Sequence, residues 1–261
     1  IKMNGSKISH LLLKEGREYS ERILKGLTAG VSHFHAVQYI KKELVSNGFI
    51  EIKEMDKWKL EGGKSYYFTR NASTIVAFTL GDKVEAEGID LFKVIGCHTD
   101  SPVIRLAPHA KIEKHGFQQM NIQPYGGGLW RTWFDRDLGL AGKVIIKEKD
   151  SDKLSSKLWD SKSAVMSIPS LCIHLNREPE FNPNKESHLK PILATSVVDQ
   201  LMGEGVQAFA DKPDVFNIER KNFVTFLDRI AKDLDVDIEQ IVDFEFCAYD
   251  HHPPAITGFH Q

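Results

Sequence analysis

One short run limits what this chain can fold into more than any other. The ten residues that begin at Lys93 read KVIGCHTDSP: an apolar segment, then a histidine and an aspartate without a loop between. Near-continuous apolar strands are typical of sheets covered on both faces, as in α/β proteins, and ligand sites collect where such strands end. We therefore predict a buried strand over residues 91–97, with His98 and Asp100 at its end.

The first hundred residues alternate helical and strand patterns. Apolar residues at helical spacing predict helices over residues 6–28 and 35–46. Short β-rich runs at residues 66–69 and 73–80 follow, with turn residues between them. Helices followed by apolar strands predict an α/β layer structure for this part of the chain.

The pattern changes after Pro102. Little helical period follows it, turn residues are frequent, and one clear strand stands at residues 143–147, so we predict a β-rich insertion or second domain. The polar residues 149–163 predict a surface loop. Further on, residues 220–234 have the spacing of an amphipathic helix, and residues 240–250 have the composition of a strand.

Composition and charge exclude several classes of function. The net charge is −2 and the isoelectric point is about 6.6, so no basic surface is expected to bind nucleic acid or an anionic membrane. The sequence contains no run of eighteen apolar residues, the length that would predict a membrane span. The N-terminal segment does not resemble a signal peptide. The three cysteines each lie in an apolar run, which predicts buried, reduced thiols of a cytoplasmic protein.

The spacing of His98 and Asp100 suits metal chemistry without proving it. Residues i and i+2 of a strand point to the same side, so the two side chains would face one space. A neutral imidazole ligates zinc, and a nearby carboxylate can orient its ring. A hydrogen-bonded pair that closes a strand end has the same spacing, and a zinc site needs three or four protein ligands.

Longer runs carry a resemblance. They are HTDSP from His98, SHFHAV upstream of it, and then, in order, GFQQMNIQPYGGGLWRTWFDRDLGLAGKVIIK, IPSLCIHL, FNPNKESHLKPILAT and FCAYD. Together they resemble the M18 metallopeptidase family, the aspartyl aminopeptidases, over nearly the whole chain. The block over residues 116–142 is the most specific of them.

The resemblance implies a fold, an activity and a set of partners. The fold is α/β: a zinc-exopeptidase-like catalytic domain, partial here, with an inserted β-rich dimerisation domain. The catalytic domain would occupy residues 1–101, the insertion residues 102–244, and residues 245–261 would return to the catalytic domain. Family members use two Zn²⁺ per active site to release Asp or Glu from the N-terminus of peptides. They form dimers that assemble into dodecamers, and they are cytoplasmic or vacuolar.

Three residues take roles from the matched motifs. His98 resembles the first zinc ligand, and Asp100 resembles the catalytic aspartate that orients it. His174, in LCIHL, matches a histidine that reaches the partner subunit's active site, where it would hydrogen-bond the scissile carbonyl or the oxyanion. By its own pattern, an isolated histidine in an apolar run, His174 would instead be a buried core residue.

Other motifs receive structural interpretations. The run YGGGLW from Tyr125 has neither the preceding strand nor the following Lys-Ser/Thr of a phosphate loop, so we interpret its glycines as a turn or a close backbone contact. The charged groups of FDRD, residues 134–137, are expected to hold the insertion against the catalytic domain, and a metal-ligand role for Asp135 is the less favoured alternative. His33 and His35 are interpreted as capping or packing residues.

The resemblance also has a gap. The family's bridging aspartate, paired glutamates, further aspartate and late histidine have no match in the 261 residues. One ligand of several cannot hold two zinc ions, so we expect the chain alone to bind no catalytic zinc tightly and to be inactive. Two alternatives stay open: a non-catalytic relative that acts as an assembly or binding subunit, and a co-catalytic metallopeptidase with another N-terminal preference.

Overall fold

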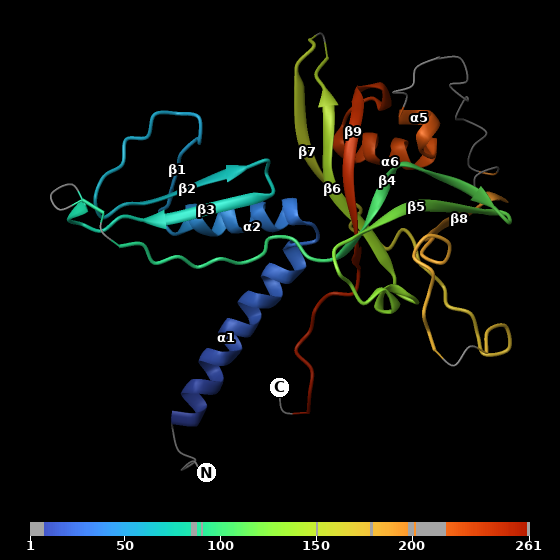
Figure 1. Cartoon of the computed structure of the whole chain (residues 1–261), viewed down its shortest axis with the longest axis horizontal. Coiled ribbons are helices and arrows are strands. Elements are labelled where there is room, and N and C mark those ends of the chain that lie inside the picture. Colours follow the sequence, from blue (N-terminus) through green and yellow to red (C-terminus); the bar gives the residue numbers. More distant parts are fainter. Residues whose placement is uncertain are drawn as a thin grey trace. The chain divides into compact units, whose positions relative to one another are not determined.

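The computed structural model describes residues 8–84, 88–89, 91–149, 151–177, 180–197, 201 and 218–259. The chain divides into two compact units (Figure 1). The first consists of Ile1–Thr99 and Pro253–Gln261, and the second of Asp100–His252.

The first unit combines the helices α1 and α2 with a small sheet. Helix α1 spans Ile8–Ala29 and helix α2 spans His33–Ser46, close to the predicted ranges. The sheet has the order β1-β2-β3, with β1 at Ile50–Glu51, β2 at Ser65–Arg70 and β3 at Thr74–Thr79. Strands β1 and β2 are parallel, and β2 and β3 are antiparallel.

His33 and His35 lie in the first turn of α2, where each makes a local contact. The Ser32 side chain accepts a hydrogen bond from the His35 amide and lies 2.8 Å from the Nδ1 atom of the same residue, so Ser32 is the N-cap. The His33 ring packs 3.9 Å from the ring of Phe34, which is buried together with Val37. The interpretation of His33 and His35 as packing and capping residues agrees with these contacts.

The strand predicted over residues 91–97 is wrong. These residues have no strand pairing, and the side chains of Val94 and Ile95 are 84% and 95% exposed. A buried strand needs hydrogen-bonded neighbours and covering layers, and within the described residues the sheet of this unit consists of β1, β2 and β3 alone. The strand argument that placed His98 and Asp100 on one side therefore does not apply to this structure.

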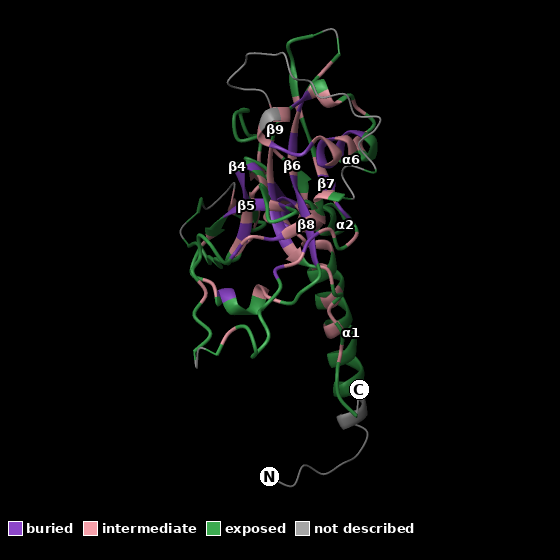
Figure 2. Cartoon of the chain, turned by 90° about the vertical axis from the view of Figure 1, so that its right-hand side faces the viewer, coloured by how far each residue is buried: buried purple, intermediate pink, exposed green. Residues whose placement is uncertain are grey.

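The second unit is built on a six-stranded antiparallel sheet with the order β7-β6-β9-β4-β5-β8. Its strands are β4 (Val103–Lys114), β5 (Phe117–Tyr125), β6 (Leu138–Lys147), β7 (Leu154–Asp160), β8 (Ile192–Thr195) and β9 (Ile241–Asp250). The prediction of a β-rich region after Pro102 is confirmed. Figure 2 shows that the buried residues follow the central strands of this sheet.

The surface loop predicted over residues 149–163 is wrong in its second half. Strand β7 pairs with β6 along its whole length, from Leu154 to Asp160. Because β7 is an edge strand, only Trp159 on it is buried, and its other side chains can be polar. That composition made the strand look like a loop.

The amphipathic helix predicted over residues 220–234 is divided in two. Helix α5 spans Ile218–Lys221 and helix α6 spans Val224–Leu234, with an extended residue, Phe223, between them. Helix α6 buries its apolar face, and the ring of Phe226 meets those of Trp159 and Phe246 edge-on at 6.2 and 6.0 Å. Such aromatic contacts hold α6 to the sheet.

Gly142 on β6 lies directly against the backbone of β9. A Cβ atom there would overlap the carbonyl oxygen of Glu245 on β9. We expect Gly142→Ala to lower the free energy of unfolding by about 3 kcal/mol, because the two strands must separate to admit the methyl group. Gly127→Ala is the control, since nothing lies within 4 Å of its added Cβ. Equal urea midpoints for both variants would contradict this prediction.

The prediction of three buried thiols holds only for Cys247. It is 1% exposed, whereas Cys97 and Cys172 are exposed. Cys97 ends the uncovered apolar run of the first unit. Cys172 precedes an exposed turn in the second unit, so in both cases an apolar sequence does not produce a buried side chain.

The cysteines should differ in reactivity. Burial raises the pKa of the Cys247 thiol to about 11, so little of it is thiolate near pH 8. We expect mass spectrometry of the native 261-residue chain after brief iodoacetamide treatment at pH 8 to show adducts on Cys97 and Cys172 only. Modification of Cys247 should require denaturant, and its modification in the folded chain at the rate of the other two would argue against the core described above.

Candidate functional site

His98 and Asp100 fall on either side of the division between the two units. His98 is exposed and belongs to the first unit, while Asp100 is partly buried and is the first residue of the second. Between them, the Thr99 hydroxyl donates a hydrogen bond of 2.7 Å to the carbonyl oxygen of Ser73. This bond attaches the end of the 91–99 segment to the turn before β3.

Asp100 is held by a residue that the sequence patterns did not identify. The Tyr125 hydroxyl donates a hydrogen bond to the Asp100 Oδ2 atom, and this bond raises the pKa of the Tyr125 phenol. Tyr125 ends β5, where it pairs with Val103 of β4, three residues after Asp100. The register of the β4–β5 hairpin indicates this contact, but the sequence patterns predict neither of the two strands.

The Tyr125 ring is itself packed. The guanidinium carbon of Arg105 lies 3.9 Å from the ring centroid, within the range of a cation–π contact. The Arg105 Nη1 atom also lies 3.3 Å from the Glu245 Oε1 atom. A continuous series of contacts therefore runs from β9 through β4 and β5 to Asp100.

Gly126, the first glycine after Tyr125, makes a close backbone contact, which is one of the two interpretations given to this run from the sequence. Gly126 has a φ of +79°, and a Cβ atom there would lie 3.3 Å from Pro102. Glycine is needed for both reasons, the positive φ and the lack of space. The turn therefore packs directly against the segment that carries Asp100.

Asp135 has a local structural role. Its carboxylate accepts hydrogen bonds from the Ser170 amide at 2.8 Å and the Ser170 hydroxyl at 2.5 Å, which lower the pKa of the Asp135 carboxyl group. Its own amide donates to the Ile168 carbonyl oxygen at 2.9 Å. These bonds lie inside the second unit and fix the start of the segment that leads to His174.

His174 lies in an exposed turn. The amides of Leu175 and Asn176 both donate to the carbonyl oxygen of Cys172, at 2.9 and 3.0 Å. His174 is exposed, and the neighbouring Ile173 is 69% exposed. The interpretation of His174 as a core histidine is therefore wrong: the apolar residues around it are a surface feature.

The described residues do not make a complete metal site. Within the ranges that the structure describes, no group of three or more His, Cys, Asp or Glu side chains gathers to hold a metal ion. His98 has suitable chemistry for zinc, but one imidazole does not fit the three or four ligands that zinc requires. In the same ranges, no helix is long and apolar enough to cross a membrane.

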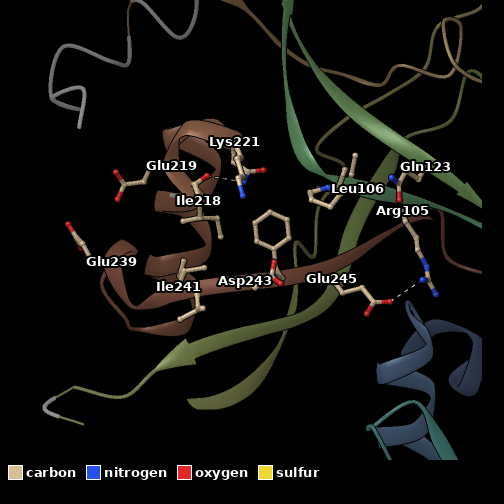
Figure 3. Close-up of a pocket in the computed structure, with 15 residues that line it drawn as sticks. Arg105, Leu106, Gln123, Ile218, Glu219, Lys221, Glu239, Ile241, Asp243 and Glu245 are labelled. Atoms are coloured by element: carbon tan, nitrogen blue, oxygen red, sulfur yellow. Dashed lines mark hydrogen bonds and ion pairs between the residues drawn. The ribbon is translucent and has the colours of Figure 1, made fainter. Parts of the chain in front are cut away.

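A cavity of about 740 Å³ lies in the second unit (Figure 3). Its walls come from β4, β5, α5, the short helix η3 (Ile238–Gln240) and β9, and they mix apolar side chains with both signs of charge. The ion pair of Arg105 and Glu245 lies at one side of it. Asn222, 2% exposed, donates from Nδ2 to the Ile218 carbonyl oxygen at 2.9 Å. Sequence patterns gave no sign of this cavity.

Comparisons with a family model and with curated proteins indicate the same family. The sequence model described as "Aminopeptidase I zinc metalloprotease (M18)" matches residues 27–261. A protein of Ricinus communis named "Probable aspartyl aminopeptidase" is 40% identical over an alignment that covers 94% of this chain and 52% of that protein. The "Aspartyl aminopeptidase" of Dictyostelium discoideum is 37% identical, with coverage of 87% and 49%. The chain thus spans about half the length of these relatives.

Solved structures agree. The structure titled "Structure of Chaetomium thermophilum mApe1" has a TM-score of 0.79 and 28% identity, covering 93% of this chain and 53% of that one. The structure titled "Cryo-EM structure of the Ape4 and Nbr1 complex" has a TM-score of 0.75 and 32% identity, covering 91% and 45%. Since the family model matches nearly the whole sequence and the fold agrees, the chain belongs to the M18 family of aminopeptidase I zinc metalloproteases.

Proposed function

We propose that the protein containing this chain is a zinc-dependent aminopeptidase that releases N-terminal Asp or Glu from peptides. The observation that carries this proposal is the family membership, with 40% identity to a probable aspartyl aminopeptidase across 94% of the chain. The proposed location is the cytoplasm, with the vacuole as the alternative.

The chain contributes part of the active site in this proposal. His98 supplies one zinc ligand, and Asp100 is the catalytic aspartate that orients it. Two Zn²⁺ per active site belong to the proposal, and such a pair of metal ions activates a water molecule and polarises a carbonyl group. Because the described residues offer only one of the ligands, the complete site needs further ligands from elsewhere in the protein.

Self-association is the second part of the proposal. Residues 102–244 would form the dimerisation domain, and His174 would hydrogen-bond the scissile carbonyl or the oxyanion in the partner subunit's site. The exposed apolar side chains on either side of His174 support this, because a partner would cover them: Leu171, Ile173 and Leu175 are 63%, 69% and 74% exposed. Dimers would assemble further, into a dodecamer.

Two alternatives to this function stay open. The first is a non-catalytic relative that serves as an assembly or binding subunit. A co-catalytic metallopeptidase with another N-terminal preference is the alternative within enzymes.

Hydrolysis rates separate these functions. The naturally expressed protein should release p-nitroaniline from Asp and Glu derivatives at least about tenfold faster than from Leu-p-nitroanilide, since polar recognition discriminates strongly. Prolonged treatment with a chelator should abolish the activity, and added Zn²⁺ should restore it. A Leu rate equal to the Asp rate would point to another peptidase specificity. No hydrolysis with any substrate would favour the non-catalytic subunit.

Mixing inactive variants tests the role of His174. In a mixture of His174→Ala and His98→Ala subunits, a mixed dimer keeps one intact site if His174 acts across the interface. Random pairing in a two-fold dimer then restores about a quarter of the wild-type activity, measured after subunit exchange.

The matched control for this experiment mixes His98→Ala with Asp100→Ala. Both residues are proposed to serve the site of their own subunit, so this mixture should stay inactive. Recovery in neither mixture would show that His174 does not act in the partner's site.

A further inference from the structure

We propose that Tyr125 is a positioning residue for Asp100: its phenol hydrogen bond fixes the orientation of the Asp100 carboxylate. The proposal rests on the proposed function for the role of Asp100, and its geometry rests on contacts within the second unit alone.

The hydrogen bond has a defined direction. A phenol hydroxyl has one hydrogen to donate, and an ionised carboxylate only accepts, so Tyr125 donates and the Asp100 Oδ2 atom accepts. Hydrogen bonds to ionised acceptors are the stronger kind. One oxygen of Asp100 is thereby fixed in place, and with it the direction in which the carboxyl group faces.

The backbone brings the two residues together and keeps them there. Because Tyr125 pairs with Val103 across the β4–β5 hairpin, the phenol lies beside the residues that precede β4. Gly126 packs against Pro102, so the turn after Tyr125 touches the segment that begins with Asp100. The contact is therefore part of the hairpin and does not depend on a mobile side chain alone.

The aromatic ring is held from its other side. Arg105 stacks on the Tyr125 ring at 3.9 Å and pairs with Glu245 of β9 at 3.3 Å. A ring confined between its strand and a guanidinium group loses rotamer freedom, so its hydroxyl is directed at Asp100 before any substrate binds. Figure 3 shows the ion pair of Arg105 and Glu245, which is the contact of this series farthest from Asp100.

Tyr125→Phe in the naturally expressed protein removes the hydroxyl and keeps the ring. We expect kcat on Asp-p-nitroanilide to fall by about 10- to 100-fold, the usual loss when a residue that orients a metal-site group is removed. KM should change less than about twofold, since the variant removes no contact assigned to substrate. Zinc affinity, measured by chelator competition, should fall about tenfold.

Tyr249→Phe is the matched control. The Tyr249 hydroxyl donates to the Asp160 Oδ1 atom at 2.7 Å, which is another tyrosine–aspartate hydrogen bond of the same unit. Its loss should also cost stability, but it should leave kcat and zinc affinity within about twofold of wild type, because neither residue has a role in the proposed site.

Exchange of the amide hydrogens of Thr99, Asp100, Ser101 and Val103 gives a result that does not depend on activity. Exchange there should be faster in Tyr125→Phe than in Tyr249→Phe. Unchanged exchange together with unchanged kcat would overturn the positioning role and leave the proposed function standing. Faster exchange in a protein whose wild type hydrolyses no substrate would uphold the contact and refute the aminopeptidase function.

Discussion

The second unit depends on the pairing of β9, its last strand, with both β6 and β4. This strand pairs with β6 from Leu138 to Ile146 and meets β4 at Arg105 opposite Cys247, so it joins two groups of strands that are far apart in sequence. Phe246 of β9 also anchors the aromatic contacts beneath α6. The sheet, its helix and the contacts that lead to Asp100 all require this late segment to be in place.

The same pairing connects the core with the candidate site. Glu245 on β9 meets Arg105 on β4, Arg105 packs on Tyr125 of β5, and Tyr125 bonds Asp100. The first of these contacts is an ion pair, the second is a cation–π contact and the third is a hydrogen bond. A polar side chain at the edge of the unit thereby takes its orientation from strands in the middle of the sheet.

Sequence patterns predicted what depends on local spacing and failed where pairing decides. The spacing of apolar residues located α1, α2 and much of α6, because amphipathic helices carry their own signal. Sequence patterns do not predict the edge strand β7, because an edge strand tolerates polar side chains. They predict a strand over residues 91–97, whose apolar side chains are exposed in the structure. Tyr125 could not have been linked to Asp100 without the register of β4 and β5, which is a long-range property.

The ends of the second unit have a topological consequence. Arg105 lies opposite Cys247, so the start of β4 and the end of β9 are neighbours in the sheet, one strand spacing apart or about 5 Å. Two chain segments that enter β4 and leave β9 at these positions therefore begin about one strand spacing apart, so a loop that joined them would close at little cost in entropy. By the same geometry, the first and last strands of the unit offer adjacent points at which a circular permutation could join its ends.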